Sequence, residues 1–196
     1  MSTLPEAARL TRRDVLLSST ALAVGMTVSP ARIWAATRDA EPKATAARPV
    51  LDDLCDAVIP ATDTPGARAA GVGAFVELAA AHGMNGASDD LLPKFAAALD
   101  EFAGGAYLQQ SEERRRALLT EIDARSFAKR DDASLPEVLR HWPRLKGLVL
   151  IGYYTSEIGA SQELQYMLVP GHFDPDVPIK PGDRAWSSDW TGVKFA

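Results

Sequence analysis

Few residues of this chain have the types and spacing that catalysis requires, and the first candidates are Ser126 and Lys129. A lysine one helical turn after a serine could activate its hydroxyl as a nucleophile. The companion elements of such sites, S-D-N and K-T-G, are absent from the sequence. Tyr153 has Glu157, four residues on, where a hydride-transfer site would use a lysine. No glycine-rich nucleotide loop or G-x-S-x-G motif occurs either, so we expect no catalytic residue and no bound cofactor.

Residues that ligate metals are equally sparse. The histidines His82, His141 and His172 are far apart, and Cys55 is the single cysteine, which excludes an internal disulfide. Zinc sites use closely spaced ligand pairs, and carboxylate-bridged metal pairs need Glu-x-x-His twice plus two further glutamates. Glu137 and His141, four residues apart, do not meet either pattern. We expect no metal site, and we interpret Cys55 as a small buried apolar residue.

The stretch GYYTSEIGASQEL, residues 152–164, groups tyrosines, hydroxyls and carboxylates directly after an apolar segment. One interpretation is a helix end that passes into a polar loop. The other is a recognition surface, in which tyrosines supply rigid contact area and polar groups fix the register. We favour the recognition surface. Its expected contact residues are Tyr153, Tyr154, Glu157, Gln162 and Glu163.

The N-terminal residues have the pattern of an export signal. Arg12 and Arg13 precede a weakly apolar stretch at 15–28, which is shorter than the roughly 20 apolar residues of a membrane-spanning helix. Paired arginines before such a stretch are typical of a twin-arginine signal, which exports proteins already folded. The alternative is an amphipathic first helix of the folded domain. Because the pair Ala35-Ala36 offers small residues for a peptidase, we expect residues 1–36 to be the signal and the protein to be extracytoplasmic.

Composition and apolar spacing predict the fold of the remaining chain. The 196 residues are 46% hydrophobic and 24% charged, with a net charge of −5, which suits one soluble domain and argues against nucleic-acid binding. Residues 37–49 lack an apolar period and are expected to be a linker. Apolar residues then recur at helical spacing, and no segment alternates with period two. We expect an all-α bundle of about five helices over residues 50–164.

Local signals predict where these helices begin and end. The first three are expected near 51–59, 71–82 and 89–103. Ser111 is a candidate N-cap of the fourth helix. Ser134 and Glu137 have the spacing of a capping box at the start of the next one. Within that apolar segment, Pro143 is expected to kink or restart the helix.

The tail, residues 165–196, differs from the helical region. It contains four prolines, which exclude a continuous helix, and more large aromatic residues than a solvated disordered tail would carry. Such a segment either wraps its own domain or lies along another protein, and both can hold. Its expected contact residues are Phe173, Trp186 and Trp190.

Two blocks carry a resemblance to a known family. IPATDTPG, residues 59–66, and GYYTSE, residues 152–157, resemble the gluconate 2-dehydrogenase subunit 3 family, and the resemblance extends from about residue 50 to 190. It implies a non-catalytic small subunit that accompanies an FAD-containing large subunit of the glucose-methanol-choline type, often with a multihaem cytochrome c subunit. In this family the small subunit is similar to a chaperone and export escort. Asp14 and Val15, after the arginines, depart slightly from the usual signal.

The resemblance sets the expected function. It implies a periplasmic accessory subunit, associated with the membrane through its complex, whose partner oxidises a sugar, sugar acid or polyol. The alternative is an independent extracytoplasmic enzyme or binding protein with a site around Tyr153–Glu163. Flavin or haem that co-purifies with the chain would favour the accessory subunit.

Overall fold

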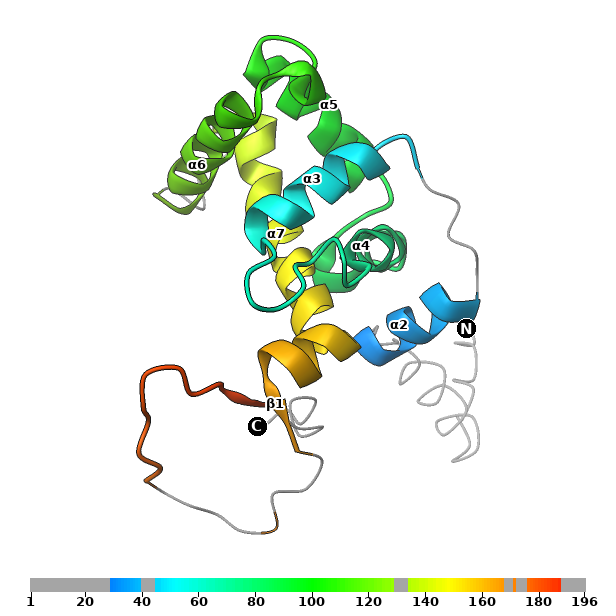
Figure 1. Cartoon of the computed structure of the whole chain (residues 1–196). Helices are drawn as coiled ribbons and strands as arrows, with labels where there is room; N and C mark the ends of the chain where they lie inside the picture. The colour runs from blue at the N-terminus through cyan, green and yellow to red at the C-terminus, as the bar shows by residue number, and fades with distance from the viewer. Residues whose placement is uncertain (1–28, 40–44, 129–133, 168–170, 172–175, 188–196) are drawn as a thin grey trace, which may run out of the picture.

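The computed structural model describes residues 29–39, 45–128, 134–167, 171 and 176–187. Arg12, Arg13, Phe173 and Trp190 lie outside this part of the chain. Figure 1 shows a group of packed helices with the C-terminal residues extending from one end. The predicted all-α class is confirmed, and six α-helices account for it within the described residues. They are α2 (Pro30–Asp39), α3 (Arg48–Val58), α4 (Val72–Ala81), α5 (Leu91–Ala103), α6 (Glu112–Ala128) and α7 (Glu137–Thr155).

Short elements complete the described structure. They are the 3₁₀-helices η1 (Met84–Gly86) and η2 (Tyr107–Gln109), the π-helix η3 (Gly159–Glu163), and the strands β1 (Gln165–Tyr166) and β2 (Trp186–Ser187). The two strands pair in parallel. No helix in the described residues is both long and apolar enough to span a bilayer.

Helix α7 is the central element because each of the other α-helices in the described residues packs against it. Its apolar residues Leu145, Leu148 and Val149 are each at most 1% exposed. Helix α3 likewise buries Leu51, Leu54 and Cys55 on one face. The shared core thus holds together helices that are far apart in the sequence (Figure 1).

The first residues of α6 and α7 can be compared with the predicted helix caps. The backbone N–H of Arg114 donates to Ser111 Oγ at 3.2 Å, so the predicted N-cap of α6 is confirmed. The predicted capping box at Ser134 is wrong, because Pro136 occupies the N-cap of α7 without a side-chain cap. Glu137 is therefore the first helical residue, and it pairs with His141 at 3.3 Å instead.

The prediction that the last helix restarts at Pro143 is also wrong, because α7 continues through this residue. Proline inside a helix removes a hydrogen bond and costs about 3 kcal/mol or more. The buried side chains of Leu139, Trp142 and Leu145 flank the proline on both sides. Their burial in the core offsets this cost, since tertiary packing supplies most helical stability in proteins.

Helix α2 includes residues on both sides of the expected end of the signal at 36. Ile33 is 2% exposed and belongs to the core, while Thr37–Asp39 continue the helix into the segment expected to be a linker. The other end of that segment, Arg48 and Pro49, forms the first turn of α3. Residues 40–44 lie outside the described part of the chain.

Candidate partner interface

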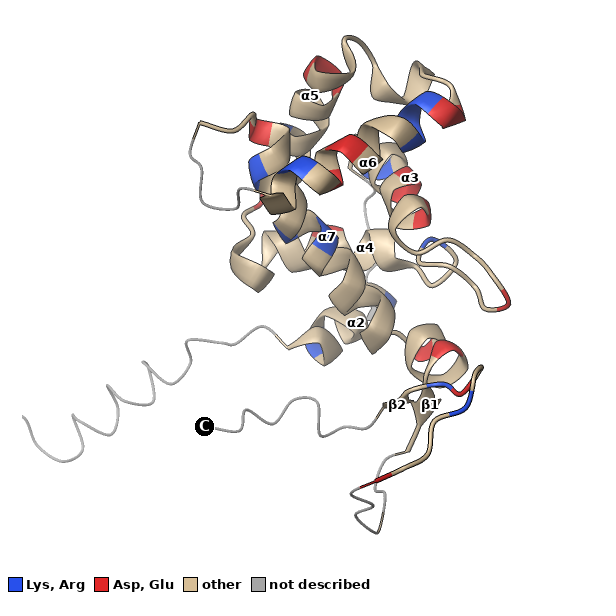
Figure 2. Cartoon of the chain, turned by 90° about the vertical axis from the view of Figure 1, so that its left-hand side faces the viewer, with Lys and Arg blue, Asp and Glu red and all other residues tan. Residues whose placement is uncertain are grey.

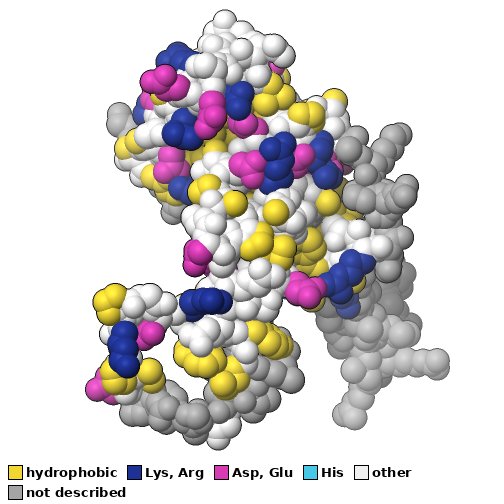
Figure 3. Space-filling view, in the orientation of Figure 1, with side chains coloured by type: hydrophobic (Ala, Val, Ile, Leu, Met, Phe, Trp, Pro, Cys, Tyr) yellow, Lys and Arg dark blue, Asp and Glu magenta, His cyan; other side chains and the backbone are white. Residues whose placement is uncertain are grey.

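Most of the large hydrophobic side chains exposed in the described residues lie at the end of α7 and in the C-terminal arm, defined as residues 165–196. Ile179 is 85% exposed, Trp186 60% and Val177 56%. Tyr154, Tyr166 and Met167 add to this set. Figure 3 shows hydrophobic side chains near the base of the arm, whereas charged side chains of both signs are spread over the helices at the opposite end. Exposed apolar groups concentrated in one region are typical of a protein-binding surface.

The described residues of the arm 176–186 are all exposed and thus do not pack into the helical core. Pairing of Gln165 with Trp186 joins the two strands of the arm, which lie side by side in Figure 2. The Gln165 side-chain amide donates to the Arg184 carbonyl at 2.9 Å, and the Arg184 guanidinium donates to the Gln162 carbonyl. The arm is therefore attached at its base and leaves its apolar side chains uncovered within the described structure.

The base of the arm is a compact joint between α7 and the loop at residues 59–67. Tyr153 is 1% exposed, and its hydroxyl donates to the Pro65 carbonyl at 2.9 Å. The Thr64 hydroxyl donates to a carboxylate oxygen of Glu163. The blocks at 59–66 and 152–157, which are 85 residues or more apart in the sequence, therefore lie against each other.

Two glycines make this joint possible because a side chain at either position would collide with backbone. A Cβ on Gly159 would stand 1.9 Å from the Tyr153 carbonyl oxygen. A Cβ on Gly66 would stand 2.7 Å from Ala61 N and Ile59 O. Ser156 closes the turn after α7, since its hydroxyl donates to Tyr153 O and accepts from Gly159 N. The local sequence thus fixes the chain path from the helix into the arm.

The expected contact residues have different positions in the described structure. Tyr153 lies in the core, with 1% of the residue exposed, so it is not part of the exposed surface. Tyr154 is 42% exposed, and Glu157 is exposed and 3.8 Å from Arg38. Gln162 is exposed, whereas Glu163 is half-buried against Thr64. Trp186 is exposed on β2, next to β1.

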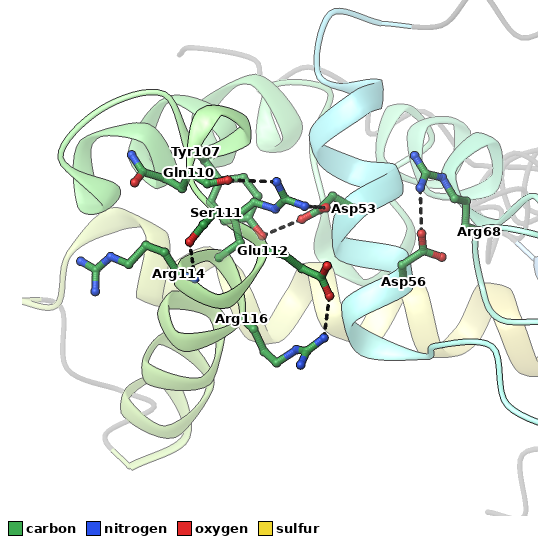
Figure 4. Close-up of polar contacts among 10 residues, drawn as sticks. Asp53, Asp56, Arg68, Tyr107, Gln110, Ser111, Glu112, Arg114 and Arg116 are labelled. Atoms are coloured by element: carbon green, nitrogen blue, oxygen red, sulfur yellow. Dashed lines mark hydrogen bonds and ion pairs between the residues drawn. The ribbon is translucent and has the colours of Figure 1, made fainter.

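A concave region that no sequence motif indicates lies between α3, α6 and α7. It is a groove of about 750 Å³ with charged side chains along its walls. In Figure 4, side chains of α3 face those of η2 and α6 across this region. The Tyr107 hydroxyl donates to Asp53 at 2.7 Å, and Arg115 pairs with the same carboxylate at 3.1 Å. Arg68 pairs with Asp56 at 2.8 Å.

The charges of this groove are paired with one another. Asp123 accepts from Trp142 Nε1 at 2.6 Å and from Lys146 at 2.7 Å. Burial raises the pKa of Asp123, but these two hydrogen bonds outweigh burial and lower it. Burial and the bond to Asp53 raise the pKa of Tyr107, so this hydroxyl stays a donor at neutral pH. The arrangement suits holding α3, α6 and α7 together rather than proton transfer to a substrate.

The remaining residues with reactive side chains support the same interpretation. Cys55 is fully buried, and burial raises the pKa of its thiol to about 12. The thiol therefore stays protonated at neutral pH, which agrees with its expected role as a small buried apolar residue. No group of three or more histidine, cysteine, aspartate or glutamate residues suited to a metal occurs among the described residues.

Comparison with known proteins identifies one family. Its model, described as gluconate 2-dehydrogenase subunit 3, matches residues 45–171 of this chain. The matched range includes the joint between the loop at 59–67 and the end of α7, and it ends before β2. The chain matches no curated protein and no solved structure.

Proposed function

Because this chain belongs to the gluconate 2-dehydrogenase subunit 3 family, we propose that it is the non-catalytic small subunit of an FAD-dependent dehydrogenase complex. It binds the flavoprotein large subunit, which is of the glucose-methanol-choline type, and serves as its folding partner and export escort. Oxidation of a sugar, sugar acid or polyol takes place in that partner. FAD resides there, and a multihaem cytochrome c is a candidate third subunit.

The exposed apolar arm is the observation that carries this proposal. Ile179 and Trp186 together present large apolar side chains to solvent, and burial of such a side chain stabilises by about 1.5–3 kcal/mol. Tryptophan and tyrosine are also the residue types that most often dominate binding energy at interfaces. A protein surface that covers this arm would recover that free energy.

The fixed base of the arm supports the same proposal. Tyr153 and Glu163 hold the loop at 59–67 against the end of α7 before any partner binds. Less conformational entropy is lost when a surface is ordered in advance, so more of the contact energy appears as affinity. The pairing of β1 with β2 extends this order from the joint into the arm.

The export role rests on the sequence before residue 29. Arg12 and Arg13 precede a short, weakly apolar stretch, as in signals that export folded proteins. A large subunit bound to this chain would cross the membrane with it as a folded pair. We therefore place the complex in the periplasm, associated with the membrane through its other subunits.

Co-purification tests the binding role. We would tag the C-terminus, express the chain with its native neighbouring genes, and record the absorbance spectrum of the purified material. The variant Ile179→Asp places a charge on an 85% exposed side chain, so it spares the fold but penalises burial in an interface. We expect at least a tenfold loss of bound flavin, about 1.4 kcal/mol of binding free energy.

The control for this experiment is Ala117→Asp, which adds the same charge to an exposed position on α6, away from the arm (Figure 1). It should retain the flavin. A colourless, stable monomer from the unaltered chain would overturn the proposal, and it would favour an independent protein with a site around Tyr153–Glu163. Equal amounts of co-purified flavin in the two variants would mean that the arm is not part of the interface.

Fractionation tests the escort role. The double variant Arg12→Lys/Arg13→Lys keeps the charge but changes the paired arginines that the export machinery reads. We expect the flavoprotein partner to stay in the cytoplasm when it is expressed with this variant. Normal export of the partner would contradict the escort role while leaving the binding role intact.

A further inference from the structure

Helix α2 packs into the helical domain as a core element, although most of it, residues 30–36, falls in the expected export signal. It lies along α4 and also contacts α7 (Figure 1). Ile33 is 2% exposed, and the ring of Trp34 lies 5.0 Å from the ring of Phe75, centre to centre. Phe75 itself is fully buried. The apolar side of α2 therefore covers part of the core.

Polar contacts fix the position of this helix as well. Trp34 Nε1 donates to the Thr155 hydroxyl at 3.2 Å, which ties α2 to the last turn of α7. Arg38 lies 3.8 Å from Glu157, but both side chains are exposed, so this ion pair contributes little. The Ser29 carbonyl accepts from the N–H groups of Arg32 and Ile33, so the helix begins at the edge of the described segment.

The small pair that would suit a peptidase lies inside this helix. Ala35 and Ala36 are helical, with Ile33 and Trp34 just before them. Proteases cut preferentially at exposed loop tips and ends, where the backbone is free to change conformation. Cleavage after Ala36 would require α2 to leave α4 and to unwind, and it would remove Ile33 and Trp34 from the core.

We propose that α2 is a permanent part of the folded domain and that the chain is not cleaved after Ala36. The mature protein then keeps Ile33 and Trp34, and any processing point lies before Pro30. The docking of α2 is independent of the proposed function. The statement about processing rests on the proposed export. A protein exported in its folded state would reach a signal peptidase with α2 already docked.

Thermal unfolding of the full chain tests the docking. Ile33→Ala removes a buried side chain, whereas Arg32→Ala changes an exposed neighbour on the same helix. We expect the first variant to lower Tm by at least about 4 °C, as buried isoleucine truncation does in a chain of this size. Arg32→Ala should stay within about 2 °C of the unaltered chain. Equal Tm values for the two variants would overturn the proposal.

Intact-mass measurement tests the processing. The chain carrying a C-terminal tag is recovered from the periplasmic and membrane fractions after expression with its neighbouring genes. A mass that includes Ile33 and Trp34 supports the proposal, and a chain that begins at Thr37 overturns it. Recovery only from the cytoplasm would contradict the proposed export, and the comparison of Tm values would still decide whether α2 belongs to the folded domain.

Discussion

The bond between Tyr153 and Pro65 gives the sharpest test of the joint at the base of the arm. The variant Tyr153→Phe removes the hydroxyl that donates to the Pro65 carbonyl at 2.9 Å and keeps the buried ring, so it opens no cavity. A hydrogen bond of this kind contributes about 1 kcal/mol net to the free energy of unfolding. For a chain of this size, we expect Tm to fall by about 2–4 °C.

The neighbouring residue supplies a matched control. Tyr154 is 42% exposed, and its ring contacts that of Tyr153 edge-on at 5.3 Å, a contact that phenylalanine retains. Tyr154→Phe should therefore leave Tm unchanged. Hydrogen exchange adds a local measurement, because the amide of Ala67, bonded to Ile59 O, should exchange faster in Tyr153→Phe alone.

The two tyrosine variants also define the result that refutes this reasoning. Equal Tm values would mean that the bond to Pro65 does not hold the loop against α7. A lower Tm in Tyr154→Phe only would assign the supporting role to the wrong tyrosine. With either result, the joint between the loop at 59–67 and α7 would no longer support the proposed interface.

Three further predictions concern other positions. Gly159→Ala should lower the free energy of unfolding by about 3 kcal/mol or more, because its Cβ would meet the Tyr153 carbonyl; urea unfolding measures this. Cys55 should resist modification by maleimide in the native state. Its thiol has an ordinary pKa of 9.0 and a pKa of about 12 in the folded protein, so the free energy of unfolding should fall as pH rises between these two values. Burial alone would raise the pKa of Glu77, but hydrogen bonds from Arg48 and Thr45 outweigh burial, so the pKa of Glu77 is lower than its ordinary value. The Glu77 carboxylate therefore stabilises the fold fully above pH 4.5, its ordinary pKa, and this stabilisation is lost as pH falls through the lower folded pKa. Glu77→Gln should be less stable than the unaltered chain at pH 7, and the difference between the two should shrink as the pH falls over that range.

Helical periodicity was sufficient to predict the core-facing side of α3. Leu51, Leu54 and Cys55 are buried together because they fall on one face of the helix, which the spacing of apolar residues reveals directly. The all-α class followed from the same signal. Pro143 shows its limit, because the local cost of a proline is visible in the sequence but the packing that offsets it is not.

Helix α2 could not be distinguished from a signal by composition. Ile33 and Trp34 are apolar in either role, and only the burial of Ile33 and the packing of Trp34 against Phe75 identify a core helix. The groove was missed for a similar reason. Asp53 and Arg115 carry no motif, and the fold alone brings them within 3.1 Å across 62 residues of sequence.

The joint was predicted in part. The two blocks that carry the family resemblance meet through Tyr153 and Pro65, but neither block contains a pattern that names the other as its neighbour. Tyr153 was expected at the surface because tyrosines are common in interfaces. It lies in the core, and its hydroxyl is satisfied by a carbonyl from a distant loop.

The exposed arm has a consequence for how the cell must produce this protein. Ile179 and Trp186 are exposed in the described structure, and Trp186 belongs to one of two strands of only two residues each, a kind of element that can pair with another chain. The isolated chain should therefore self-associate as its concentration rises, and light scattering at increasing concentration measures this tendency. Under the proposed function, synthesis of this chain in balance with the large subunit would avoid such orphan chains.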